Sequence, residues 1–292
     1  MTAPNRQGSL AKRVARAVLP PIVTGTYRKL KLRSLESANP DWEYLPGGWP
    51  EASAASPGWN ADSVVQTQLD RWPAFVASVR APAPFGLSSE GAGGQLDYAV
   101  HNTIMTFGYV LARAAQGRKR LTLLDWGGGI GHYCVYARAL LPELELDYHC
   151  RDLPKLVAGG RSVLPQETFY VDEEEALGRR YDLIVASSSL HYSRDWQPLL
   201  ARLAGATNGY LYVTRQPFIE HAESYVVVQR PHRHGYQTEY PGWFLNRDEF
   251  LTAAAESGLK LQREFLINEV PNVPNAPEAA DYRGFLFSRA DR

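Results

Sequence analysis

The chain has 292 residues, and its 31 Lys and Arg side chains are balanced by 31 Asp and Glu side chains, so the formal net charge is zero. This length predicts one large domain or one domain with an appendage, and 45% apolar residues provide enough material for a hydrophobic core and exclude global disorder. The zero net charge excludes a strongly basic nucleic-acid-binding protein as the default, so we expect no nucleic-acid partner.

The first predicted feature is a basic arm at residues 1–33, which holds eight Lys and Arg side chains and no acidic side chain. One interpretation is a solvated arm, and the other is a weak contact with anionic lipid at a membrane surface. The remainder of residues 1–95 is rich in Pro, Gly, Ser and Trp. We expect this part to form an irregular or helical N-terminal extension, whose aromatic side chains fill a satellite core or serve as a lid.

Residues 96–292 alternate helical and strand patterns, with a polar insertion expected at about 216–246. Apolar side chains at spacings of three and four residues predict a helix at 95–116. We predict strands at 121–126, 144–150, 168–171, 181–187, 209–214, 259–267 and 282–288. Further helices are expected at 132–141, 155–161, 196–203 and 247–257.

This order of elements predicts an α/β fold, with an open, mostly parallel sheet and helices on both of its faces. The last two strands are too close in sequence for a crossover helix, and we expect them to form an antiparallel hairpin at the sheet edge. The segment between them contains Pro271, Pro274 and Pro277, which disfavour a regular helix there.

The two cysteines, Cys134 and Cys150, lie in apolar segments. They are too few for a disulfide framework or a four-cysteine zinc site, and their setting predicts a reducing, cytoplasmic compartment. No apolar run approaches the ~18 residues of a membrane span. Pro20 and Pro21 interrupt the short apolar run near the N-terminus, which is not typical of a signal peptide. If the basic arm contacts lipid, we expect the protein at the inner face of the membrane.

The strongest functional signal is the segment Leu123–Tyr133, LLDWGGGIGHY, in which a predicted strand leads into a glycine-rich turn and a helix. Gly127, Gly129 and Gly131 allow the backbone to approach a ligand, and the helix N-terminus offers free N–H groups. A dinucleotide-binding motif would need glycine where this chain has His132, and a P-loop would need a Gly-Lys-Ser/Thr end. The spacing therefore disfavours a nicotinamide oxidoreductase and favours a cofactor that has an amino acid end and no pyrophosphate.

This segment resembles the first motif of class I S-adenosylmethionine-dependent methyltransferases. The chain is also similar to small-molecule O-methyltransferases and to a bacterial methyltransferase family associated with surface polysaccharide or secondary metabolite pathways. The resemblance implies a seven-stranded, Rossmann-like methyltransferase sheet and S-adenosyl-L-methionine as the cofactor. It also implies that Asp125, Gly127, Gly129 and Gly131 contact this cofactor.

Further acids match the same family. Asp152 and Leu153 stand in an Asp-Leu-Pro triplet after the second strand, and the resemblance assigns both residues to the cofactor. The family has a carboxylate there that accepts both ribose hydroxyls, and one carboxylate can accept two O–H bonds at once. Asp147, inside the strand, is the competing ribose acid, and a helix N-cap is the structural alternative for Asp152. Asp172, after the third strand, is implied to contact the adenine amino group.

Residues 187–196 follow the fourth strand, and ligands of open α/β sheets bind beyond the carboxyl ends of strands. They resemble the Leu-His-x-Trp stretch of O-methyltransferases, with three additional residues before the Trp. The resemblance implies that His191 is the general base, that Ser188 contacts the cofactor and that Tyr192 contacts the substrate. A structural histidine near the adenosine pocket is the alternative for His191, and His101 is the second candidate base.

The insertion contributes His221, His232 and His234, which we expect to bind the substrate in the acceptor pocket. A zinc site built from these histidines would be expected to show His-x-x-x-His or Glu-x-x-His spacing, which the segment lacks. The sequence therefore predicts no metal.

Together these assignments predict an enzyme that transfers a methyl group to a hydroxyl of a small molecule or glycan by in-line displacement. The methyl group of a sulfonium is already activated, so the enzyme chiefly positions the nucleophile and excludes water. A histidine suits removal of the acceptor proton because its ordinary pKa lies near neutrality. Two alternatives stay open: an N-methyltransferase acting on a small-molecule amine, and a non-catalytic S-adenosylmethionine-binding protein. The sequence also leaves open a homodimer.

Overall fold

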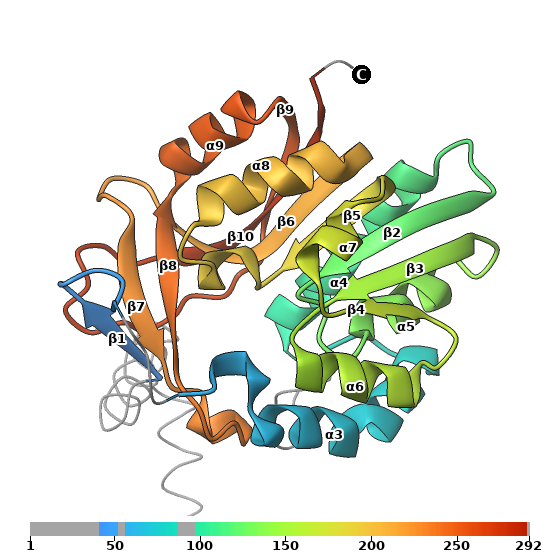
Figure 1. Cartoon of the computed structure of the whole chain (residues 1–292), viewed down its shortest axis with the longest axis horizontal. Helices are drawn as coiled ribbons and strands as arrows, with labels where there is room; N and C mark the ends of the chain where they lie inside the picture. The colour runs from blue at the N-terminus through green and yellow to red at the C-terminus, as the bar shows by residue number, and fades with distance from the viewer. Residues whose placement is uncertain (1–40, 52–55, 87–96, 291–292) are drawn as a thin grey trace, which may run out of the picture. The chain divides into compact units, whose positions relative to one another are not determined.

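One mixed ten-stranded β-sheet organises the described part of the chain, which comprises residues 41–51, 56–86 and 97–290 of a computed structural model (Figure 1). All described residues belong to a single unit, Asp41–Arg292. The basic arm predicted at 1–33 lies outside the described residues. The boundary expected at residue 95 stays a prediction.

Parallel strands form the centre of the sheet. In spatial order they are β4 (Thr168–Tyr170), β3 (Glu145–Arg151), β2 (Arg120–Trp126), β5 (Tyr181–Ser187) and β6 (Thr207–Ile219). The strand β10 (Asp281–Arg289) pairs antiparallel with β6, and β9 (Leu259–Leu266) pairs antiparallel with β10. The seven predicted strands and the antiparallel final pair are therefore confirmed.

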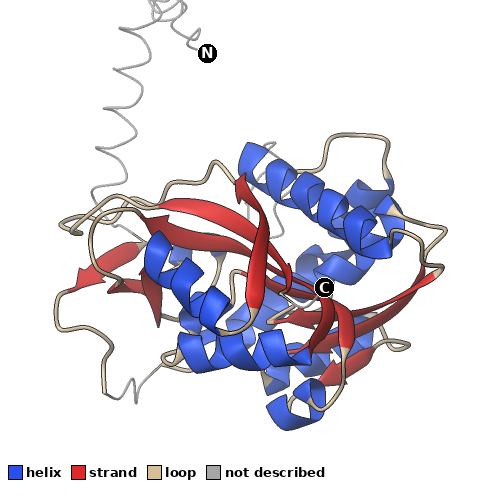
Figure 2. Cartoon of the chain, turned by 90° about the horizontal axis from the view of Figure 1, so that it is seen from above, coloured by secondary structure: helices blue, strands red, loops and turns tan. Residues whose placement is uncertain are grey.

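Helices cover both faces of this sheet, as Figure 2 shows. They are α4 (Tyr98–Ala115), α5 (His132–Leu140), α6 (Pro154–Val163), α7 (Glu173–Leu177), α8 (Trp196–Ala206) and α9 (Arg247–Glu256). Leu123 and Val185 pack in a cluster with α4, α5 and α6, whereas their neighbours Leu124 and Ile184 pack in a cluster with α7, α8 and α9. Successive strand residues thus point to opposite faces, which is why both faces bury apolar side chains. Among the described helices, none is both long and apolar enough to cross a membrane.

Sequence reasoning missed three strands beside β6. These are β1 (Trp42–Leu45), β7 (Tyr225–Gln229) and β8 (Tyr240–Asn246). β6 extends to Ile219, beyond the predicted end at residue 214, and its last residues pair in parallel with the end of β8. β7 pairs antiparallel with β8, and β1 pairs antiparallel with β7. The insertion expected at 216–246 is therefore a strand-rich extension of the sheet.

The part of the predicted N-terminal extension that the structure describes is mostly helical. A short 3-10 helix, η1 (Gly58–Asn60), leads into the long helix α3 (Asp62–Arg80), which packs on α5 and α6. The contact is close because a Cβ atom added to Gly159 of α6 would lie 3.0 Å from Val65 Cγ1 of α3. Since α5 follows the glycine-rich turn directly, α3 covers the region in which the sequence predicts the cofactor.

Candidate active site

The predicted cofactor turn lies between the carboxyl end of β2 and the start of α5. The N–H of Gly127 donates to the carbonyl oxygen of Arg151 at 2.8 Å, which ties the turn to the end of β3. Gly127 and Gly131 have φ values of +71° and +99°, a backbone region that side chains with a Cβ rarely adopt. No side chain caps the N-terminus of α5. The turn thus presents backbone N–H groups at a helix start, as the sequence predicts.

Packing also requires glycine in this turn. A Cβ atom on Gly127 would lie 2.4 Å from Ser189 Cβ, and one on Gly128 would lie 2.3 Å from Asp125 Oδ2. Ser189 itself is fixed because its hydroxyl donates to the Trp126 carbonyl oxygen at 2.8 Å. The segment after β5 therefore packs directly against the turn.

Gly127→Ala is expected to lower the free energy of unfolding by about 2 kcal/mol or more, because the variant combines a strained positive φ with a steric clash. Thermal unfolding measures this change. The matched control is Gly205→Ala in α8, where an added Cβ meets no atom within 4 Å. The control should be as stable as the wild type or more stable by up to about 1 kcal/mol. Equal unfolding temperatures for both variants would contradict the packing argument.

Asp125 lies at the end of β2, and none of its side chain is exposed. Its Oδ2 accepts a hydrogen bond from the Tyr148 hydroxyl at 2.6 Å, whereas Oδ1 has no partner among the described residues. Burial raises the pKa of this carboxyl group to about 7. A buried carboxylate with one oxygen unpartnered is suited to a ligand that brings a donor or a positive charge.

Asp152 follows β3 and is 6% exposed. Its two oxygens accept hydrogen bonds from the N–H groups of Gly129 at 2.7 Å and Leu153 at 2.6 Å, and burial raises its pKa to about 6. A carboxylate has about four acceptor positions, so two stay available for ribose hydroxyls. The structural alternative is not observed, because Leu153 is the N-cap residue of α6 and the first-turn N–H of Lys155 donates to Asn60 instead of Asp152.

The competing acid, Asp147, lies in the amino-terminal half of β3. It stands opposite Thr122 in the parallel register, away from the turn that follows Trp126. Its oxygens are engaged with Arg120 and His149, each at 3.1 Å. These contacts support the choice of Asp152.

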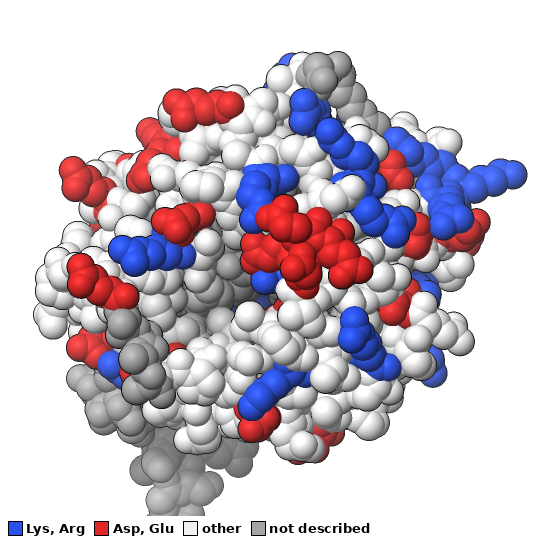
Figure 3. Space-filling model, in the orientation of Figure 1, with Lys and Arg blue, Asp and Glu red and all other residues white. Residues whose placement is uncertain are grey.

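Asp172 is exposed, and its Oδ1 caps the helix α7 by accepting the N–H of Glu175 at 2.8 Å. Figure 3 shows the acidic side chains of this helix gathered beside a hollow of the same face. The structure thus uses the Asp172 carboxylate as a helix cap, and its contact with adenine stays a prediction.

His191 lies in a short 3-10 helix, η2 (Leu190–Tyr192), directly after the segment that packs on the turn. Its imidazole is fully buried, and Nδ1 lies 3.0 Å from Oε1 of Gln216 in β6. Because an amide oxygen only accepts, Nδ1 carries the hydrogen and Nε2 carries the lone pair. Nε2 has no partner among the described residues, and burial lowers the pKa of this imidazole to about 3. The imidazole is therefore neutral near pH 7.

Ser188, the predicted cofactor contact, lies three residues before His191. It has a φ of +50°, and its N–H donates to the Thr214 carbonyl oxygen.

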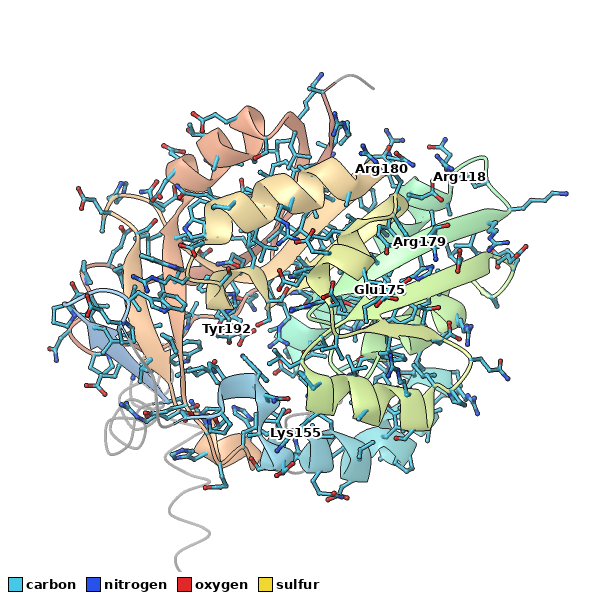
Figure 4. The ribbon with its side chains drawn as sticks, viewed as in Figure 1. Arg118, Lys155, Glu175, Arg179, Arg180 and Tyr192 are labelled. Carbon is cyan, nitrogen blue, oxygen red and sulfur yellow. The ribbon has the colours of Figure 1, made fainter. Side chains whose placement is uncertain are left out.

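Aromatic side chains cover this imidazole. The Tyr192 ring lies 3.9 Å from the His191 ring and 4.9 Å from the Tyr240 ring of β8, and its hydroxyl donates to Gln229 Oε1 at 2.7 Å. Trp59 of η1 stacks on Tyr240 with 4.5 Å between the ring centres. Figure 4 labels Tyr192 and Glu175 on opposite sides of the hollow that Figure 3 shows in the same orientation. The sequence predicted Tyr192 as a substrate contact but did not place Tyr240 beside it.

The other predicted histidines are not brought to this place. His101, in α4, contacts the Phe85 carbonyl oxygen through Nδ1 at 2.9 Å. His221 is exposed before β7, whereas His232 and His234 lie after β7 in the 3-10 helix η3 (His232–His234). His221 thus lies at one end of β7 and the other two histidines lie beyond its other end, and their contact with the substrate stays a prediction. Within the described ranges, no cluster of His, Cys, Asp and Glu could hold a metal ion.

S-adenosyl-L-methionine fits the residues present. The glycine turn leaves no Cβ to obstruct close approach to its backbone, and two buried carboxyl groups at adjacent strand ends, Asp125 and Asp152, have acceptor capacity left. Such an arrangement at the carboxyl edge of a parallel sheet is where open α/β folds bind their ligands.

The comparisons with known proteins agree with this arrangement. A family model described as "Methyltransferase domain" matches residues 102–264. No curated protein matches the sequence.

Solved structures with a similar fold include methyltransferases with different acceptors. The first is an S-adenosylmethionine-dependent methyltransferase from Clostridium acetobutylicum ATCC 824, with 10% identity, a TM-score of 0.46, and coverage of 64% of this chain and 92% of that chain. The second is the 1,6-didemethyltoxoflavin-N1-methyltransferase from Burkholderia thailandensis, with 14% identity, a TM-score of 0.44, and coverage of 83% and 94%. The third is the O-methyltransferase of a trans-AT PKS multienzyme from Brevibacillus brevis, with 13% identity, a TM-score of 0.45, and coverage of 66% and 75%.

Proposed function

Because the chain belongs to the methyltransferase domain family and uses S-adenosyl-L-methionine, we propose that it methylates a hydroxyl group of a small molecule or a glycan. When bound, the cofactor supplies a methyl group on a positively charged sulfur, which is already activated for transfer. Gly127, Gly129 and Gly131 would hold its amino acid end together with Asp125, and Asp152 with Leu153 would hold the ribose. The remaining task of the protein is to position the acceptor and to receive its proton.

We assign proton removal to His191, and one observation carries this assignment. The imidazole is fully buried in the 3-10 helix that follows Ser189, the residue packed on the cofactor turn, and its Nε2 lone pair has no partner among the described residues. With a pKa of about 3, His191 is too weak a base to ionise an alcohol in advance. It can accept the proton during transfer, because a hydroxyl becomes strongly acidic as its oxygen bonds to the methyl carbon. General base catalysis of this kind contributes about 10²- to 10⁴-fold.

Gln216 has a defined part in this proposal. By accepting the Nδ1 hydrogen of His191 at 3.0 Å, its amide oxygen holds the tautomer that leaves Nε2 free to take a proton. Gln216 is itself fully buried in β6, so water does not compete for this hydrogen bond. The Tyr192 ring, 3.9 Å from the imidazole, also excludes water from His191. Gln216 is thus a positioning residue that acts through His191.

An amine acceptor is the second candidate, and the low pKa of His191 is the observation that favours it. A neutral amine already carries a reactive lone pair and needs little help from a base. Methyl transfer from S-adenosylmethionine labelled on the methyl group, offered to matched panels of hydroxyl and amine acceptors, separates the two. Label on oxygen supports the proposal, and label on nitrogen alone overturns it. Calorimetry with S-adenosylhomocysteine and NAD(P) tests the cofactor independently.

Gln216→Glu is expected to raise the pKa of His191 by at least about one unit, because a negative charge close to Nδ1 stabilises the imidazolium. An NMR titration of the imidazole measures this without any acceptor. In the wild type His191 should not titrate between pH 5 and pH 8, since burial holds its pKa at about 3. The control is Gln262→Glu, which adds the same charge at an exposed position of β9. Equal His191 titrations in all three proteins would contradict the pairing.

A further inference from the structure

Gln68 of α3 points at the glycine turn from outside the family match, which begins at residue 102. Its side chain is buried at 7% exposure, and a Cβ atom on Gly129 would lie 3.1 Å from Gln68 Oε1. Oε1 has no hydrogen-bond partner among the described residues. A buried carbonyl oxygen without a hydrogen-bond partner destabilises the fold, so this orientation calls for a ligand that donates to it.

The position of Gln68 is fixed by the way α3 is docked. At the start of the helix, Asn60 Oδ1 accepts the N–H of Lys155 at 3.0 Å, and Asp62 forms an ion pair with the Lys155 ammonium group at 2.7 Å. Further along, the rings of Trp72 and Phe75 lie 5.3 Å and 4.7 Å from the ring of His132, the first residue of α5. These contacts lie on both sides of Gln68 in the sequence. The Gln68 amide is therefore held over the turn, because α3 is anchored both before and after this residue.

The amide has the chemistry that an amino acid requires. The amino acid end of S-adenosylmethionine carries an ammonium group, which only donates, and a carboxylate, which only accepts. A glutamine amide offers one acceptor oxygen and two N–H donors, and it brings no charge of its own. Asp125 already supplies a buried carboxyl group beside the turn, so a neutral partner from α3 avoids a second negative charge there.

We propose that Gln68 binds the amino acid end of the cofactor, with Oε1 accepting a hydrogen bond from the ammonium group. This inference rests on the proposed function, since it requires S-adenosylmethionine at the turn. It extends the binding site beyond the residues of the family match. It also gives α3 a direct role, because the helix contributes a ligand contact to the site it covers.

The test compares ligands that possess or lack the amino acid end. S-adenosylhomocysteine has it, whereas 5′-methylthioadenosine keeps the nucleoside and the sulfur but has no amino acid. Calorimetry should show that Gln68→Leu weakens S-adenosylhomocysteine binding about 10-fold or more, as expected for a lost hydrogen bond to a charged group. Binding of 5′-methylthioadenosine should be unchanged. The matched control is Gln66→Leu on the exposed side of α3, where the Gln66 amide donates to Asp70 at 2.7 Å. This variant should alter neither affinity.

The binding results distinguish a failure of the proposed function from a failure of the Gln68 contact. If the wild type binds neither ligand, the proposed function fails. If the wild type binds both and Gln68→Leu weakens both equally, Gln68 supports the fold of the site and the inference is wrong. Unchanged binding of S-adenosylhomocysteine in a folded variant overturns it as well. If Gln68→Leu does not fold, Gln68→Met keeps an unbranched side chain of similar length and removes the same polar atoms.

Discussion

His191→Ala is expected to lower the rate of methyl transfer by about 10²- to 10⁴-fold, the contribution of a general base. Binding of S-adenosylhomocysteine should stay close to that of the wild type, because the glycine turn and Asp152 hold the cofactor without the imidazole. The rate should fall because the variant removes the buried Nε2 lone pair, which no described residue occupies and which is assigned to receive the acceptor proton. A steady-state rate measured with saturating acceptor, together with calorimetry, reports the two quantities separately.

The control for this variant is Gln262→Ala, since Gln262 is exposed in β9 and should be replaceable without loss of activity. Removing a buried side chain can also destabilise the fold, so His191→Gln serves as the second variant. It retains a polar side chain of comparable size but has no basic nitrogen. A wild-type rate in a folded His191→Ala or His191→Gln protein would show that the histidine only supports the structure or that another group takes the proton.

The central strands could be predicted because their sequences are informative locally. Strands such as β2 and β5 have mainly apolar sequences, and each is followed by a turn with distinctive residues. β7 and β8 were missed for a different reason. Pro241 lies within β8 and argues against a central strand there. β7 does have a strand-like sequence, three valines between Tyr225 and Gln229, but it was overlooked because residues 216–246 were interpreted as a polar insertion. Their pairing depends on tertiary contacts that local spacing does not reveal.

The cofactor side of the site could be proposed from the sequence, because the glycine turn directly follows a predicted strand and the family resemblance points to Asp152 after the next one. The contacts of these residues with the cofactor stay predictions. The residues that hold His191 and cover the glycine turn could not be predicted. Gln216 is 25 residues from His191, and no local pattern links the two. Gln68 lies in a helix that contains Pro73, within a segment whose composition suggested irregular structure. The contact of such residues with the site is decided by how α3 and β6 pack, which the sequence alone does not specify.

Asp152→Ala is expected to weaken the binding of S-adenosylhomocysteine at least about tenfold, which corresponds to about 1.4 kcal/mol. The variant removes the carboxylate predicted to accept the ribose hydroxyls, and it also removes the acceptor for the N–H of Gly129 at 2.7 Å. Calorimetry measures the loss. The matched control is Asp147→Ala, because Asp147 is the competing acid of the same strand and contacts Arg120 and His149 instead. A loss confined to Asp147→Ala would reverse the assignment.

The pH dependence of binding gives a second test of the same carboxylate. Burial raises the pKa of Asp152 to about 6, so its ionised form predominates at pH 8 and is lost as the pH falls through 6. Because the ionised form is the better acceptor for two hydroxyls, affinity for S-adenosylhomocysteine should decrease between pH 7 and pH 5. Asp125, with a pKa of about 7, titrates in an overlapping range, and Asp152→Asn separates the two because it cannot ionise. If the pH profile of Asp152→Asn matched that of the wild type, the ribose contact would have to be assigned to another residue.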